Sequence, residues 1–120
     1  MNLDIDNADI EKSFDRIAKD ILLNKSLYMN DIEFRFTEIE FYYIHKDNHP
    51  DNYTHQLKRD KGEWRFHNQG FDITFDGNND ISDGGILIRG ISIKDEYVNG
   101  PIKVLKKYLN VLEKLLKVTV

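Results

Sequence analysis

The sequence contains no cysteine, and only two of its 120 residues are proline. The missing thiols exclude disulfides, iron–sulfur clusters, thiol catalysis and cysteine-ligated zinc sites. No apolar run approaches the roughly 20 residues that a membrane-spanning helix needs. The segment Met1 to Asp9 is acidic and lacks the hydrophobic stretch of a secretory signal. We therefore expect a cytoplasmic protein with no membrane partner.

The charge balance is mildly acidic, with 17 basic and 21 acidic residues and a formal net charge of −4. Non-specific affinity for nucleic acid comes from cationic side chains that displace counterions. The acidic balance therefore argues against a protein that binds along the phosphate backbone of a nucleic acid. No linker, repeat or low-complexity tract divides the chain. We therefore predict that residues 1–120 form a single domain with its own core.

Two segments carry the apolar spacing of amphipathic helices. The first spans residues 7–24, with Asn7 or Asp6 as its N-cap. The second spans residues 101–117 and begins with Pro101, a residue suited to a first helical turn. The apolar positions of the second are expected to pack on a sheet, although a leucine-rich face also suits a dimer; they are Ile102, Leu105, Leu109, Leu112 and Leu116.

Residues 31–44 alternate apolar and polar side chains as a strand does, but the alternation changes phase near Thr37. Either the apolar face switches there, or a bulge re-aims the second half of the strand. Further strands are predicted at residues 64–67, 71–75 and 86–93, and residues 76–85 are expected to form an exposed connection. The order of elements predicts an α+β fold, with a curved antiparallel sheet flanked by an N-terminal and a C-terminal helix.

Glu38 and Glu40 lie two residues apart on the long strand, so their carboxylates share one face, roughly 6.5–7 Å apart. Glu40 precedes three aromatic residues, Tyr42 among them. A carboxylate beside aromatic walls can act as a general base toward water. The alternative is an ordinary solvent-facing half of a strand.

Arg89 interrupts an apolar strand, where a guanidinium is costly unless an acid or an anion pairs with it. It either forms a structural ion pair with Glu38 or Glu40, or completes a polar pocket with them that Asp72 also joins. Three histidines at positions 45, 49 and 55 have no spacing typical of metal ligands, so no metal site is expected. A single histidine paired with a carboxylate is favoured instead.

Five short motifs in this order resemble the alkyladenine (3-methyladenine) DNA glycosylase family, and more closely its short relatives. They are I-E-F-Y, Y-T-H, G-F-D-I-T, L-I-R-G-I and N-G-P-I-K. The resemblance runs from about Arg35 to Lys103. It implies a glycosylase-like core and a pocket for a base taken out of a DNA duplex.

The resemblance also implies roles for individual residues. The catalytic glutamate that activates water falls on Glu40, and the pocket tyrosine falls on Tyr42. The histidine that contacts the base falls on His55, and the arginine that supports the water and a phosphate falls on Arg89. Asp72 stands near the family's base-screening asparagine. The tyrosine that the family inserts into the duplex has no counterpart near residues 65–67.

These observations predict a cofactor-independent N-glycosidase that recognises a purine-like base in damaged DNA or in a small nucleotide. Glu40, His55 and Arg89 are the expected catalytic residues, and Glu38, Tyr42 and Asp72 are expected to bind the ligand. One alternative is a non-catalytic protein that binds or sequesters a small nucleotide or modified base in the same pocket. Another is a structural domain in which Glu40 and Arg89 only neutralise each other.

Overall fold

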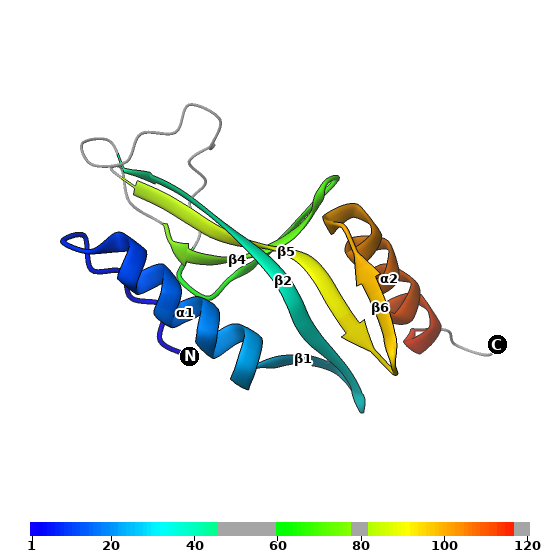
Figure 1. Cartoon of the computed structure of the whole chain (residues 1–120). Coiled ribbons are helices and arrows are strands. Elements are labelled where there is room, and N and C mark those ends of the chain that lie inside the picture. The colour runs from blue at the N-terminus through cyan, green and yellow to red at the C-terminus, as the bar shows by residue number, and fades with distance from the viewer. Residues whose placement is uncertain (46–59, 78–81, 117–120) are drawn as a thin grey trace.

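The computed structural model describes residues 1–45, 60–77 and 82–116. All strand pairs are antiparallel, and the sheet order is β1-β2-β5-β4-β3. Strand β6 pairs with the C-terminal end of β5. The sheet curls, with one helix at each end (Figure 1). The predicted α+β class, curved antiparallel sheet and two helices are therefore confirmed. In chain order the elements are α1 (Ile10–Asn24), β1 (Ser26–Met29), β2 (Ile32–His45), β3 (Trp64–His67), β4 (Gly70–Asp76), β5 (Ser82–Ile93), β6 (Glu96–Asn99) and α2 (Pro101–Leu115).

Helix α1 begins three residues later than the sequence predicted, and Asp9 is its N-cap. The Asp9 side chain accepts a hydrogen bond from the backbone N–H of Lys12 at 3.1 Å. Asp6 instead accepts the backbone N–H of Ala8 in the preceding turn. The expected cap at Asn7 or Asp6 was therefore wrong, because Asp6 is engaged in closing that turn.

A β-bulge in β2 resolves the phase change near Thr37. The pairing with β5 shifts on both sides of Glu38: Thr37 of β2 is skipped between Phe36 and Glu38, and Arg89 of β5 is skipped between Gly90 and Ile88, which restores the register. Phe36 and Ile39 consequently both contribute to the hydrophobic core, although they have opposite parity. The bulge alternative is confirmed: β2 is one strand whose apolar side chains stay on one face.

Strand β5 changes phase at the same level, through Gly90. Ile88 and Ile91 are both buried although they have opposite parity. Gly90 lies opposite Glu38, and a Cβ atom on Gly90 would come within 2.6 Å of Thr37 Oγ1. The bulge in β2 therefore requires a residue without a side chain at this point of β5.

The two helices pack on the same face of the sheet. Phe71 and Phe75 share one face of β4 because they are four residues apart. Phe75 contacts Phe14 of α1 at a ring-centroid distance of 5.5 Å, and Phe71 contacts Tyr108 of α2 at 5.3 Å. This helix face holds the core, and the opposite face of β2 and β5 is left to polar side chains.

The sequence analysis missed three strand segments. β1 and β6 have four residues each, and the β5–β6 turn is formed by Lys94 and Asp95 in left-handed conformations, without the asparagine–glycine pair that signals such a turn. The expected exposed connection at 76–85 was wrong for residues 82–85, which are buried in β5, and residues 78–81 lie outside the described part of the chain. Gly84 is needed there, since a Cβ atom on it would clash with the ring of Phe75.

Helix α2 contacts the core through only part of the predicted stripe, Leu105 and Leu112, together with Val104, Tyr108 and Val111. Val104 and Leu105 are buried, whereas Ile102 and Leu109 are each 47% exposed. The heptad-like spacing therefore identified an apolar stripe but not the side that contacts the sheet. Within the described ranges, no helix is long and apolar enough to cross a membrane.

We predict that Gly90→Ala lowers the free energy of unfolding by about 1–3 kcal/mol, because the new methyl group overpacks the bulge. Thr37→Ala, which removes the nearest atom, should recover part of this loss in the double variant and have little effect alone. Urea unfolding of the parent, both single variants and the double variant measures the coupling. Additive effects would show that Thr37 does not meet residue 90.

The raised pKa of Tyr43 predicts that the folded protein becomes less stable at alkaline pH. Burial, the carboxylate of Asp76 and a hydrogen bond to that carboxylate raise the pKa of Tyr43 from 10.0 to about 12. Between these values the unfolded chain has lost a proton that the folded chain keeps, so the stabilising contribution of Tyr43 is complete below pH 10 and falls as the pH rises toward 12. In the Tyr43→Phe variant the free energy of unfolding, measured with urea, should change less between pH 10 and pH 12 than it does in the parent. The same dependence on pH in both proteins would contradict the role of Tyr43.

Candidate functional site

The polar face is the side of β2 and β5 that points away from the helices. On β2 it carries Glu38, Glu40 and Tyr42, and on β5 it carries Leu87 and Arg89. Glu40, Tyr42 and Leu87 each lie between side chains that point into the core, and Glu38 and Arg89 lie at the two shifts in the pairing. The acidic pair and the arginine, predicted from widely separated parts of the chain, therefore share one surface.

Arg89 contacts both acids of the long strand. Its Nη1 atom donates to Glu40 Oε2 at 2.8 Å, and its Nε atom lies 3.4 Å from Glu38 Oε1. The side chains are 37% exposed for Arg89, 57% for Glu38 and 55% for Glu40. The guanidinium is thus not enclosed in apolar surroundings, and ion pairs this exposed contribute only about 0–1 kcal/mol to stability.

The start of α2 holds the strand at Arg89. The backbone N–H of Gly100 donates to the carbonyl oxygen of Arg89 at 2.7 Å. Pro101 lies close to Gly70 at the start of β4, where a Cβ atom would come within 3.1 Å of the proline ring. The backbone at Arg89 is therefore held by the residue before α2, and the first residue of α2 lies against the start of β4.

Asp72 lies on the polar face but makes a different pair. It is 1% exposed, and its Oδ2 atom lies 3.0 Å from His67 Nε2 across the β3–β4 hairpin. In the register, Glu40 faces Leu87 and Leu87 faces Asp72, which separates the two acids by two strand spacings, roughly 10 Å. Asp72 therefore belongs to the same surface as Glu40 without joining its ion pair.

The sequence analysis missed His67, although a signal for it was present. The two residues between His67 and Gly70 form a tight hairpin turn, which makes Arg65 the direct partner of Asp72. His67 then becomes a diagonal neighbour of Asp72 on the same face. The expected pairing of a carboxylate with one of the histidines at positions 45, 49 and 55 lies outside the described side chains and stays a prediction.

Tyr42 continues the polar face beyond Glu40. It lies opposite Gly85 of β5, and a Cβ atom on Gly85 would clash with the Tyr42 hydroxyl group. The tyrosine ring therefore lies across β5 in space that only glycine leaves open. Tyr42 is therefore the next side chain of the polar face after Glu40, and its ring is directed toward β5.

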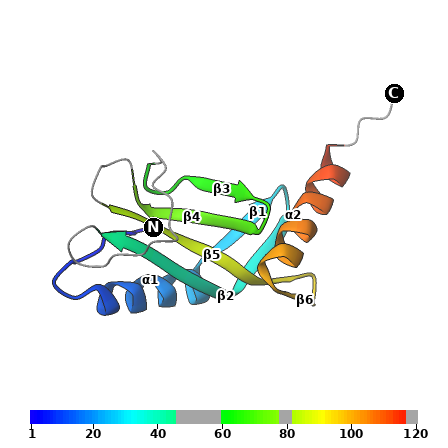
Figure 2. The same ribbon diagram turned by 90° about the horizontal axis from the view of Figure 1, so that it is seen from above.

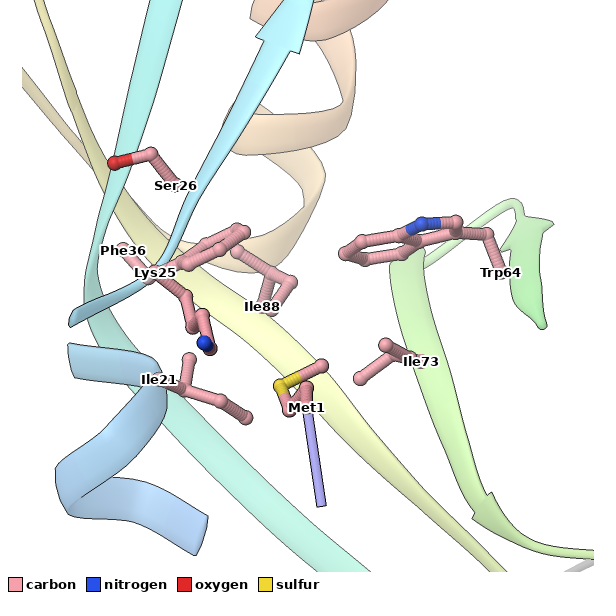
Figure 3. A pocket seen from close by; sticks show the side chains of 8 residues that line it. All are labelled: Met1, Ile21, Lys25, Ser26, Phe36, Trp64, Ile73 and Ile88. Carbon is pink, nitrogen blue, oxygen red and sulfur yellow. The ribbon is translucent and has the colours of Figure 1, made fainter. Parts of the chain in front are cut away.

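An apolar cavity of about 110 Å³ lies on the helix face, between α1 and the sheet (Figure 3). An engineered cavity of about 150 Å³ accommodates benzene, so this one is too small for a purine base. It also contains no carboxylate. The cavity is therefore separate from the polar face and is not a base pocket. Its lining residues are Met1, Ile21, Lys25, Ser26, Phe36, Trp64, Ile73 and Ile88.

The histidine predictions lie largely outside the described residues. His49 and His55 fall between residues 45 and 60, and only the backbone of His45 is described. Among the described residues, no group of three or more histidine, aspartate or glutamate side chains is arranged to hold a metal ion. The role of His55 stays a prediction from the resemblance.

The chain matches no family model, no curated protein and no solved structure. The glycosylase resemblance consequently stays a prediction. The fold brings one arginine into contact with two carboxylates on the polar face, and Tyr42 lies on the same face.

We predict that the two polar pairs differ in their importance for stability. His67→Ala should cost about 1–3 kcal/mol, because it removes a hydrogen-bond partner from the buried carboxylate of Asp72. Arg89→Leu should cost less than about 1 kcal/mol, because its acidic partners can be hydrated. Chemical unfolding of the two variants makes the comparison, and a larger loss for Arg89→Leu would show that the exposed ion pair supports the fold.

Proposed function

We propose that this chain is a compact N-glycosidase-like domain that recognises a purine-like base and hydrolyses its N-glycosidic bond. The observation that supports this most is the 2.8 Å contact between Arg89 and Glu40 on the polar face. The arginine fixes the orientation of the carboxylate, and the exposed half of the side chain is accessible to water. An oriented, hydrated carboxylate is the group that a hydrolytic general base requires.

In the proposed reaction, Glu40 accepts a proton from water as the water oxygen bonds to the sugar carbon. The carbon–nitrogen bond breaks, its electron pair leaves with the base, and solvent supplies the proton that the released base takes up. Among the described residues, Arg89 is the ion-pair partner of Oε2, so Oε1 is available for the proton. The nearby Glu38 carboxylate stabilises the positive charge that develops on the sugar in an oxocarbenium-like transition state.

Tyr42 and Asp72 are proposed to contribute to base recognition. The Tyr42 ring provides a surface beside Glu40 for stacking of a planar base. Asp72 is 1% exposed, so its proposed contribution acts through His67, whose Nε2 atom lies 3.0 Å from its carboxylate and whose side chain is 23% exposed. Under this proposal His55 completes the contacts to the base, as the resemblance implies, and no metal or organic cofactor takes part.

A small nucleotide or nucleoside fits the charge of this chain better than a long duplex does. The net charge is −4, and on the polar face the guanidinium of Arg89 is already paired with two acids. Affinity for a polyanion requires cations that can release counterions from phosphates. Damaged DNA stays in the proposal as a substrate whose binding should be weak and steeply dependent on salt.

A non-catalytic binder of the same ligands is the second candidate. The observation that favours it is that a single guanidinium contacts both carboxylates, with Glu38 at 3.4 Å and Glu40 at 2.8 Å. Two carboxylates fixed in this way can accept hydrogen bonds from the amino groups of a base without activating water. The binder and the hydrolase differ in whether the bound ligand is released as a free base.

We predict that Glu40→Gln lowers base release about 100-fold or more and leaves ligand binding within a few-fold of the parent, because glutamine keeps the shape but cannot accept the proton. The substrates are purine nucleosides, purine nucleotides and a duplex that contains an alkylated purine. Chromatography of the free base measures release, and calorimetry measures binding. Base release that is unaffected by Glu40→Gln would contradict the proposed role of Glu40.

Two control variants make this test specific. Glu38→Gln removes the neighbouring acid on the same strand and should weaken binding more than it slows release from the bound state. Glu113→Gln changes an exposed acid of α2 outside the polar face and should affect neither quantity. If the parent binds a purine ligand without releasing the base, and Arg89→Ala abolishes that binding, the chain is a binder and not a hydrolase.

A further inference from the structure

Helix α2 has two apolar stripes, and the sheet uses one of them. Val104, Leu105 and Tyr108 face the core together with Val111 and Leu112. A second, exposed stripe borders the first. It contains Ile102 at 47%, Leu109 at 47% and Leu116 at 67% exposure.

The exposed stripe belongs to a regular heptad pattern. Residues 102, 105, 109, 112 and 116 are separated alternately by three and four positions and are all isoleucine or leucine. This spacing is that of positions a and d in a coiled coil. We refer to these five residues as the α2 seam. Leu105 and Leu112 lie where the seam borders the core-facing stripe.

The position of α2 leaves the seam accessible. The helix lies at the outer edge of the molecule, and its C-terminal end extends beyond the sheet (Figure 2). Phe66 of β3, which is 49% exposed, lies 5.2 Å from the ring of Tyr108 and enlarges the apolar surface beside the helix. A helix that is apolar on two sides normally buries both.

We propose that the α2 seam binds the α2 seam of a second copy of this chain, with the two helices antiparallel. A two-fold axis through such a pair places Leu109 against Leu112 of the second copy. This layer pairs a position a with a position d, and the two-fold symmetry repeats it.

Charge complementarity supports this register. Lys106 and Glu113 both occupy position e, next to the seam, and both are exposed. In the antiparallel register that pairs residue 109 with residue 112, Lys106 lies beside Glu113 of the second copy, and the symmetry repeats the pair. Within the described part of the chain, neither residue has an ion-pair partner of its own.

A parallel pair lacks this complementarity. There, position e faces position g, and the g positions of α2 are Tyr108 and Leu115, which carry no charge. The charged flank of the seam therefore favours the antiparallel arrangement.

The lysines of α2 suggest a competing occupant, an anionic membrane surface. Lys103, Lys106, Lys107 and Lys114 make the helix basic on its polar sides. Lys107, however, is paired with Glu96 of β6 at 2.9 Å, and Glu113 borders the seam that would enter the lipid. An acidic flank is unfavourable against anionic lipid and favourable against Lys106 of a second copy, so a second copy is the better occupant.

Charge exchange in the complete chain tests the register. Lys106→Glu and Glu113→Lys each bring like charges together twice in the dimer, so each should raise the dimer dissociation constant by about tenfold. The double variant restores both pairs and should recover the parent value. An equimolar mixture of the two single variants should form a heterodimer. Sedimentation velocity over a concentration series measures all four samples.

Leu109→Lys tests the seam itself, and Leu23→Lys is its control because Leu23 is an exposed leucine of α1. The first variant should be monomeric and the second should dimerise like the parent, with both folded by circular dichroism. The proposal is overturned if the parent is monomeric at its highest soluble concentration, if Leu109→Lys still dimerises, or if the double charge variant fails to recover. Binding of the monomeric parent to phosphatidylserine vesicles would assign the seam to a membrane instead.

Discussion

The pairing of β2 with β5 around the extra residue Thr37 is the constraint on which the rest of the structure depends. A strand alternates its side chains strictly, so an unbroken β2 would place either Phe36 or Ile39 on the wrong side of the sheet. The bulge lets both remain in the core, and Gly90 provides the space that it needs in the partner strand. Thr37 in β2 and Arg89 in β5, each skipped in the pairing, thereby give both strands a continuous apolar face.

The same constraint creates the polar face. With the apolar side chains assigned to the core, Glu38 and Glu40 must point away from it, and Arg89 lies beside them because it precedes the glycine opposite the bulge. The resulting ion pairs are too exposed to contribute much to folding. Strand pairing therefore orients these charges, and the charges are available for recognition or chemistry.

Helix α2 links this face to the remainder of the molecule. Its first residues are bonded to the backbone of Arg89, its inner stripe covers the core around Phe71, and its outer stripe is not needed by the sheet. The sequence predicted the helix correctly but assigned Leu109 to the core. Two apolar stripes on one helix have the same local periodicity, and only contacts with distant strands distinguish the stripe that is buried in one chain.

The sequence by itself determined the features that follow from local periodicity: the two helices, the long strand with its discontinuity near Thr37, and the shared face of Glu38 and Glu40. Only the tertiary structure decided that the discontinuity is a bulge, that Arg89 reaches both acids, and that His67 holds Asp72. These outcomes depend on the register between strands far apart in the chain. Register is set by the packing of all the strands together, and no short segment encodes it.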